Sequence, residues 1–424
     1  MEIKRVCIID GARIPFTRSG ANYMGISNKK LMTGALTELV NKLSLKGKEV
    51  GEVALGAVSK HAYDFSLARE CTIEAGLSFS TPATDLQKAC GTSLEAVIML
   101  ANKIALGQID SAIAGGVDTN SDIPVEFQKT FSDKMAKVNY ARSTGDKLKA
   151  LMAIRPGDLA PNFPAVKEPR TGMSMGESCE EMAKTWKISR EDQDQLALES
   201  HQKAAKAYDE GFFSDMVYPF GTLKKDGIVR GDTTMEKMAK LKPAFDKTSG
   251  AGTLTAANST SLSDGAACVF LCSEEYAKAH GLHVKAYFKI GISSAVNYIN
   301  DEGLLMAPAY AVPKMLGKVD MRLQDFDFYE IHEAFAAQVL CTLKAWESEE
   351  FCRTKLGLDS ALGSIDRTKM NVKGGSLALG HPFAATGARI VATLAKLLDE
   401  KGSGTGLISI CTAGGMGVTA ILEK

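Results

Sequence analysis

The stretch that decides the fold is CGTSLEAVIMLANKIALGQIDSAIAGG, residues 90–116. It begins with a cysteine and small residues, continues with apolar positions at helical spacing, and ends after Gly107 in a strand-like run. Residues 381–411, HPFAATGARIVATLAKLLDEKGSGTGLISIC, repeat this order with a histidine in place of the cysteine. If the repeat reflects two similar α/β halves, their helix starts meet at the centre and bring Cys90 and His381 together. The alternative is a strand-helix unit that recurs without duplication.

The segments around this repeat predict a layered α/β fold with an insertion. Residues 5–9 form a first strand-like run, whereas residues 121–250 are rich in Lys, Asp, Pro and Met. That middle segment contains a charged helix expected around residues 189–209, capped by Ser189 with acids in its first turn. The expected domains are an N-terminal half (1–120 plus 251–280), an inserted loop domain (121–250) and a C-terminal half (281–424).

The composition is that of a neutral, globular chain large enough for several cores. Of 424 residues, 45% are hydrophobic and 24% charged, and 50 basic residues balance 50 acidic ones. This balance does not favour a nucleic acid or an anionic membrane as partner, and no apolar run approaches the roughly 20 residues that span a bilayer. The nine cysteines lack metal-ligand or disulfide spacing, and residues 1–10 lack a signal or transit peptide pattern. We therefore expect reduced thiols, a cytoplasmic location and no metal site.

Cys90 and His381 are the candidate nucleophile and base. Cys90 directly precedes a predicted helix, where backbone N–H groups and the helix dipole stabilise a thiolate over a thiol. His381 follows Gly380, whose missing Cβ lets a ligand approach the backbone of the turn. An imidazole placed there can take the proton of Cys90. The alternatives are a small buried cysteine, the usual fate of a free thiol, and a surface-loop histidine.

His332 and Cys411 add a candidate oxyanion donor and a second thiol. His332 follows the strand-like residues 328–331, at the strand edge where α/β folds place ligand sites, and a neutral imidazole there can donate to an enolate oxygen. Cys411 precedes the glycine-rich residues 413–417, whose N–H groups can bind an oxyanion, and its thiol can remove a proton from an acetyl methyl group. A solvated turn and a glycine-rich strand turn with a buried cysteine are the respective alternatives.

Together with GTLTAANSTSLSDGAA, residues 252–267, these motifs resemble those of the thiolases over nearly the whole chain. The resemblance implies a five-layered αβαβα fold of two similar halves with a loop domain inserted in the first. It implies acyl-CoA and coenzyme A as substrates, CoA being a co-substrate, with no metal or redox cofactor. It also implies assembly as a homodimer or homotetramer.

The resemblance implies a role for each candidate. Cys90 would accept the acyl group, and His381 would activate the thiol of Cys90. Cys411 would act as acid and base on the acetyl group. His332 would belong to the oxyanion hole for the thioester enolate, while the backbone N–H groups of Cys90 and Ala413 would form the second hole. The residues expected near the substrate or CoA are Ser259, Thr260, Met175, Met306 and Phe335.

Three positions depart from the commonest thiolase pattern. Many thiolases carry Gly where this chain has Ala413. The alanine leaves the backbone N–H available but narrows the pocket. Many thiolases also carry Asn where this chain has His332. A His there, with KPAF at residues 242–245, is more similar to the β-subunit of fatty-acid oxidation (trifunctional) complexes. Ser174 replaces a His of short-chain biosynthetic thiolases, which is expected to remove one polar CoA contact and open the acyl tunnel.

The resemblance therefore implies a degradative 3-ketoacyl-CoA thiolase (acetyl-CoA C-acyltransferase) of fatty-acid β-oxidation, acting on medium or long chains through a Cys acyl-enzyme. An α-subunit with hydratase and dehydrogenase activities is a candidate partner. The alternatives are an acetoacetyl-CoA thiolase (acetyl-CoA C-acetyltransferase) and a catalytically silent thiolase-like subunit. A ketoacyl synthase is disfavoured, because Cys411 fills the place where such enzymes carry a histidine.

Overall fold

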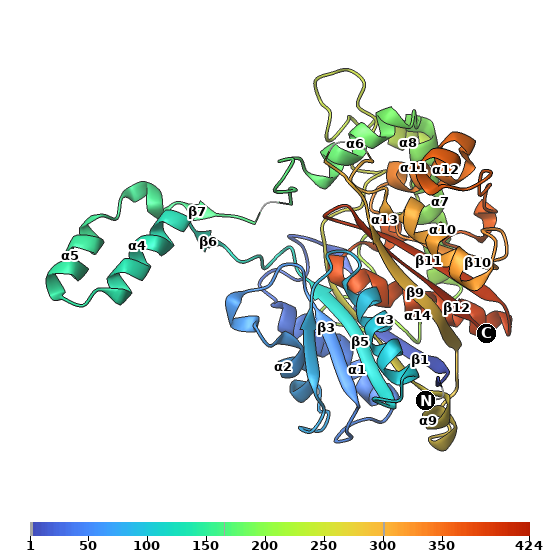
Figure 1. The fold of residues 1–424 in the computed structure, drawn as a ribbon, viewed down its shortest axis with the longest axis horizontal. Helices are drawn as coiled ribbons and strands as arrows, with labels where there is room; N and C mark the ends of the chain where they lie inside the picture. Colours follow the sequence, from blue (N-terminus) through green and yellow to red (C-terminus); the bar gives the residue numbers. More distant parts are fainter. Residues whose placement is uncertain (1–2, 165, 300–301) are drawn as a thin grey trace.

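Two α/β halves face each other across the molecule, as the repeat predicts (Figure 1). The computed structural model describes residues 3–164, 166–299 and 302–424. The strands of the two halves are β1 (Val6–Arg13), β2 (Thr17–Arg18), β3 (Glu52–Gly56), β4 (Ala83–Leu86), β5 (Ser111–Asp118), β8 (Ser263–Ser273), β9 (Ala286–Ala295), β10 (Phe328–Ile331), β11 (Thr405–Thr412) and β12 (Met416–Glu423).

Within the described residues these ten strands form one mixed sheet, in the order β10-β11-β12-β9-β1-β8-β5-β3-β4, with β2 beside β8. The halves join between β1 and β9 through only three residue pairs, which start at Val6–Phe288 and end at Ile8–Ala286. β3 is parallel to β4 and β5, and β10 is parallel to β11, so each half needs a crossover connection. The helices α3 (Thr92–Ala105) and α14 (Thr386–Lys401) lead into β5 and β11 respectively.

α3 and α14 form the central layer and correspond to the two helices of the sequence repeat. Their apolar faces are buried in one core that also takes side chains from both halves of the sheet. The helix starts touch: Ser93 Oγ accepts a hydrogen bond from Ala388 N at 2.8 Å. A Cβ at position 387 would overlap the backbone N of Leu94, so only glycine allows this approach. The close packing places the residues that precede the two helices next to each other.

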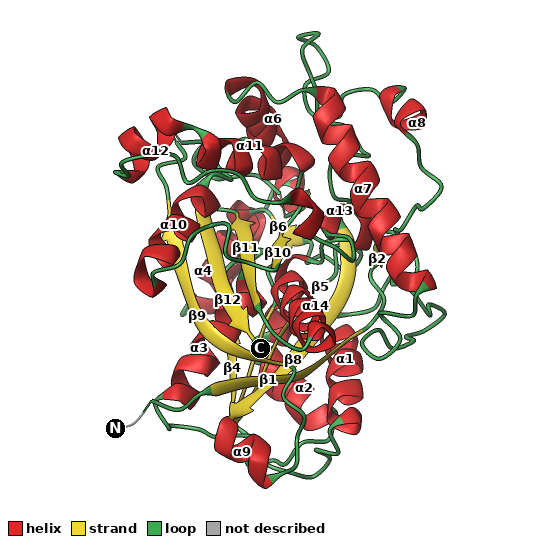
Figure 2. Ribbon diagram, turned by 90° about the vertical axis from the view of Figure 1, so that its right-hand side faces the viewer, coloured by secondary structure: helices red, strands yellow, loops and turns green. Residues whose placement is uncertain are grey.

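The two halves of the sheet both pack against the central layer of α3 and α14. Further helices cover the outer faces of these halves, which completes five layers (Figure 2). α1 and α2 pack with the N-terminal half in one core, and α10 and α11 pack with the C-terminal half in another. The α/β layered prediction is therefore confirmed. The helices outside the central layer are α1 (Asn28–Lys42), α2 (Leu67–Glu74), α9 (Glu274–Ala279), α10 (Ala307–Val319), α11 (Ala336–Glu347), α12 (Glu349–Leu356) and α13 (Ser376–Leu379).

The middle segment has two parts. One is a hairpin that projects from the body and has no buried residue in its helices (Figure 1); it comprises β6 (Glu126–Phe127), α4 (Lys129–Tyr140), α5 (Thr144–Met152) and β7 (Pro161–Asn162). The other comprises α6 (Met175–Thr185), α7 (Arg190–Asp209) and α8 (Met235–Ala239), and its apolar residues join the core of the C-terminal half. α7 begins after Ser189, which accepts from Asp192 N as predicted. Among the described residues, no helix has the length and apolar character to cross a membrane.

Candidate active site

Cys90 lies in a tight turn between β4 and α3. Ala89 has a φ of +46°, a left-handed conformation that is uncommon for a residue with a Cβ, and it redirects the chain just before the cysteine. Thr92 holds the turn closed: its Oγ1 accepts from Lys88 N at 2.8 Å, and its hydroxyl donates to Ala89 O at 2.6 Å. The turn places Cys90 at the start of α3, as the sequence predicts.

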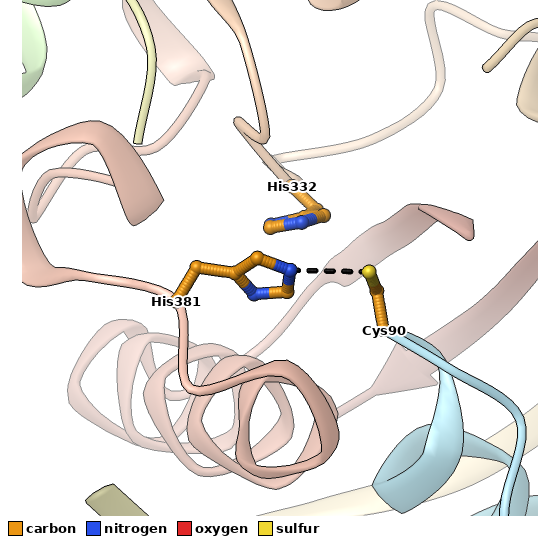
Figure 3. A group of neighbouring side chains, drawn as sticks. All are labelled: Cys90, His332 and His381. Atoms are coloured by element: carbon orange, nitrogen blue, oxygen red, sulfur yellow. Dashed lines mark hydrogen bonds between the residues drawn. The ribbon is translucent and has the colours of Figure 1, made fainter. Parts of the chain in front are cut away.

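The sulfur of Cys90 faces His381, and its thiol is neutral at rest. Nε2 of His381 lies 3.1 Å from Cys90 Sγ (Figure 3). Burial raises the pKa of Cys90 to about 12, and the N–H groups of Ala413 and of Cys90 itself lower it only in part. The backbone N–H groups thus favour the thiolate, as predicted, but lost solvation outweighs their effect. Reaction at this sulfur requires a base.

His381 has the surroundings of that base. Burial lowers its pKa to about 3, so the imidazole is neutral at working pH. Gly380, with a φ of +97°, turns the chain just before His381. Nδ1 of His381 lies 2.6 Å from Oγ1 of Thr386, the first residue of α14. If Nε2 takes the proton of Cys90, Nδ1 carries the ring hydrogen and donates it to Thr386.

His332 lies beside His381, directly after β10. Its backbone N donates to Ser409 O at 2.8 Å, and the centroids of the His332 and His381 rings are 4.1 Å apart. Burial, followed by the nearby His381 and Arg389, lowers the pKa of His332 well below its usual value. Nδ1 is 2.7 Å from Ser376 Oγ, while Nε2 has no hydrogen-bond partner among the described residues. A neutral ring with one unpartnered nitrogen therefore faces the reaction centre.

The donor atoms of Cys90, His332 and His381 all lie within 4.8 Å of one another. A thiol and two imidazoles at this spacing suit nucleophilic and acid–base catalysis, and the same groups can also be ligands of a zinc ion. The two interpretations differ in an observable way, because only a zinc-dependent site loses activity when a chelator removes the metal.

Cys411 and the glycine-rich run approach the same point from the other side. Cys411 is the last residue but one of β11, is paired with Gly417 of β12, and is buried. Burial and the nearby Cys90 raise the pKa of its thiol well above the usual value, so it is protonated at rest. Two residues on, the backbone N–H of Ala413 lies close enough to Cys90 Sγ to lower the pKa of this thiol, as does the N–H of Cys90 itself, whereas the N–H of Gly414 donates to Glu168 Oε1 at 2.7 Å. The N–H groups of Ala413 and Cys90 therefore both act on the Cys90 sulfur.

A cavity of about 700 Å³ includes Ser259 and Thr260 in its lining, two of the residues expected near CoA. Three cationic side chains that the sequence analysis missed also line it, Arg18, Arg230 and Lys237, beside His201, whose pKa burial lowers to about 4. Their neighbours in the chain form ordinary loop and helix patterns, so no local signal could have found them. The three cations make this cavity suitable for an anionic ligand.

The other three residues expected near the substrate do not line this cavity. Met306 is fully buried in the core of the C-terminal half, and Met175 packs against the same core. Phe335 is buried edge-on against Phe245, with centroids 5.8 Å apart, and Phe245 lines the cavity. Ser174 caps α6: its Oγ accepts from Glu177 N, and the Glu177 carboxylate accepts from Ser174 N. The effect of Ser174 on the acyl tunnel stays a prediction.

Comparisons with known proteins agree with this geometry. The thiolase N-terminal domain model matches residues 6–275, and the thiolase C-terminal domain model matches residues 284–424. The 3-ketoacyl-CoA thiolases of Yersinia pestis (strain Pestoides F) and Yersinia pseudotuberculosis (serotype O:1b, strain IP 31758) are each 41% identical over 99% of this chain and 97% of their own. The crystal structure of the Bacillus anthracis acetyl-CoA acetyltransferase matches with a TM-score of 0.82 and 31% identity, over 100% of this chain and 99% of that one. The chain therefore belongs to the thiolase family.

Proposed function

We propose that the protein is a 3-ketoacyl-CoA thiolase, which cleaves 3-ketoacyl-CoA with CoA to acetyl-CoA and a shortened acyl-CoA. The observation that carries the proposal is the meeting of two groups at the sulfur of Cys90. The thiol has the neutral imidazole of His381 3.1 Å away and the backbone N–H of Ala413 close enough to lower its pKa. The relatives named 3-ketoacyl-CoA thiolase, at 41% identity, support this substrate class.

The first half-reaction forms an acyl-enzyme. His381 Nε2 takes the proton of Cys90, and the sulfur attacks C3 of the substrate, whose oxyanion the N–H groups of Cys90 and Ala413 stabilise. The C2–C3 bond then breaks, the acyl group stays on Cys90 as a thioester, and the electron pair leaves with acetyl-CoA as its enolate. His332 Nε2–H donates to the enolate oxygen, and the Cys411 thiol protonates C2.

The second half-reaction releases the shortened chain. Cys411, now a thiolate, takes the proton of the CoA thiol, and the CoA sulfur attacks the acyl-enzyme. Cys90 leaves as a thiolate and recovers its proton from the His381 imidazolium, so both thiols and the imidazole return to their starting forms. The raised pKa of Cys411 suits this step, because a thiolate whose charge is poorly solvated is a strong base.

The basic cavity supports CoA as the co-substrate. Arg18, Arg230 and Lys237 provide cationic groups for phosphates, and Ser259 and Thr260 line the same cavity. Thr260 connects the cavity to the reaction centre, since its backbone N donates to Ala334 O and its hydroxyl donates to Ser376 O. A CoA bound in the cavity would thus lie next to the segments that hold His332.

The deciding experiment measures CoA-dependent thiolysis of acetoacetyl-CoA and of a long-chain 3-ketoacyl-CoA side by side. Cys90→Ala serves as the blank and is expected to lose at least about a thousandfold in turnover. Faster long-chain cleavage supports the proposal, whereas a steep fall beyond acetoacetyl-CoA indicates an acetoacetyl-CoA thiolase. No turnover of either substrate indicates a silent subunit. Dialysis against EDTA should leave activity unchanged, and loss restored by zinc would replace the acid–base interpretation.

We further propose that the protein works in fatty-acid β-oxidation in the cytoplasm, as a homodimer or homotetramer that can bind an α-subunit with hydratase and dehydrogenase activities. The nine cysteines, all free thiols, are consistent with a reducing compartment. The resemblance of residues 242–245 and His332 to trifunctional β-subunits motivates the α-subunit. Light scattering on the protein alone and mixed with a candidate α-subunit tests both assemblies, and a monomer that ignores the candidate would count against them.

A further inference from the structure

We infer that Arg389 and Ser376 set the tautomer of His332, so that Nε2 of this imidazole carries the hydrogen offered to the enolate oxygen. The inference deepens the proposed function and rests on it for the identity of the enolate. Arg389 and Ser376 are positioning residues, since they act on the reacting atoms only through the ring of His332.

The hydrogen bonds around Ser376 assign the tautomer. Arg389 Nη2 donates to Ser376 Oγ at 2.6 Å, and a guanidinium has donors only, so Ser376 accepts in this pair. In the described part of the chain, the one other hydrogen-bond partner of Ser376 Oγ is His332 Nδ1, at 2.7 Å. Oγ has a second lone pair and could also accept from Nδ1–H, but its own buried hydrogen would then have no acceptor among the described residues. The arrangement that satisfies every group has the hydroxyl donating to Nδ1, which is then the bare nitrogen of the ring. In a neutral imidazole the hydrogen then sits on Nε2.

Burial makes this assignment firm. Ser376 is 0% exposed, His332 is 1% exposed and Arg389 is 2% exposed, so bulk water does not compete for these bonds. Burial lowers the pKa of Arg389 to about 10, which leaves it a cation at neutral pH, and burial also lowers the pKa of His332 well below its usual value. Because the ring stays neutral, the choice of tautomer decides whether Nε2 can donate at all.

His381, next to His332, needs the opposite tautomer, and residues of α14 contact the groups that set both. His381 must accept at Nε2, while His332 must donate from Nε2, although the two rings lie 4.1 Å apart (Figure 3). α14 carries Thr386 against Nδ1 of His381 and, one turn later, Arg389 against Ser376. The guanidinium of Arg389 also lies near Glu330, whose Oε2 is 3.9 Å from Nη1. One helix thus keeps a base and a donor distinct in a single dry site.

Nitrogen NMR tests the tautomer without any substrate. The full-length protein labelled with ¹⁵N-histidine has six histidines, and His332→Asn identifies the signals of this ring. The expected spectrum has a pyridine-type Nδ1 and a pyrrole-type Nε2 in wild type, and a mixture of both tautomers in Ser376→Ala. A pyrrole-type Nδ1 in wild type would overturn the inference.

Kinetics then test the consequence. Loss of one oxyanion donor costs about 10²–10³ in rate, so the partial loss expected from Ser376→Ala should lower kcat by roughly tenfold or more, with KM for CoA unchanged. Ser376→Thr keeps the hydroxyl and should recover most of the activity. Ser409→Ala is the matched control, because its Oγ is equally buried on the neighbouring β11 and has no partner in the described structure.

The two readouts separate the inference from the proposed function. Equal kcat in folded Ser376→Ala and Ser409→Ala would overturn the inference even if thiolysis is confirmed. Wild-type protein that lacks thiolysis would refute the proposed function, while its NMR spectrum would still decide the tautomer of His332. Thermal unfolding of each variant establishes that the compared proteins are folded.

Discussion

Replacing Thr386 with valine tests whether His381 is held as a base. Valine keeps the shape of threonine but removes Oγ1, which lies 2.6 Å from Nδ1 of His381. The ring hydrogen on Nδ1 then lacks an acceptor in a buried site, or it moves to Nε2 and blocks the nitrogen that receives the proton of Cys90. An unsatisfied buried donor costs about 1–3 kcal/mol, which corresponds to roughly 5- to 150-fold in the acylation rate.

Rapid mixing with a 3-ketoacyl-CoA in the absence of CoA isolates this step, since the burst of acetyl-CoA reports acyl-enzyme formation. Thr342→Val is the matched control: Thr342 is fully buried in α11, and its hydroxyl donates within that helix to Gln338 O. We expect the control to acylate at close to the wild-type rate. A folded Thr386→Val enzyme that acylates as fast as the control would refute the reasoning.

Two further predictions follow from the buried titratable groups. Burial lowers the pKa of His201 to about 4, so the unfolded chain binds a proton below pH 6.5 that the folded chain does not, and this histidine should remove about 2 kcal/mol of stability as pH drops from 7 to 5. The buried carboxyls of Asp118 and Glu330, whose pKa values are raised to about 7 and about 8, act in the opposite direction, so the measurement is the difference between wild type and His201→Gln in denaturant titrations. An equal pH dependence of the two proteins would contradict the prediction. The thiolate absorbance near 240 nm should show no step for Cys90 below about pH 9, judged against Cys90→Ser; a midpoint below 8 would mean that the thiol is ionised at rest.

Much of the fold could be predicted from the sequence because its central helices have regular apolar spacing and one helix has a recognisable cap. The repeat of residues 90–116 in residues 381–411 predicts two equivalent helices, and the structure places α3 and α14 together at the centre. The charged helix after Ser189 begins at the expected cap. Apolar spacing and capping side chains act over one or two turns, so they can be read without knowledge of the rest of the molecule.

The cavity residues and the partners of the histidines could not be predicted in this way. The cavity is lined by Arg18, which lies far along the chain from the other two cations, and by Arg230 and Lys237. These side chains come together only when the chain folds. Ser376 and Arg389 lie close to His381 in the chain, but no pattern there indicates that they hold His332. Their importance comes from hydrogen bonds across segments, and a sequence pattern does not contain distances between segments.

By itself the sequence predicted an α/β layered fold, the repeated halves and the candidate reactive groups. Only the tertiary structure decided the protonation of those groups. A helix start alone favours the thiolate of Cys90, yet packing between the halves removes water from the sulfur and raises its pKa to about 12. Desolvation depends on every segment packed around the site, so the neutral thiol and neutral imidazole are properties of the assembled fold.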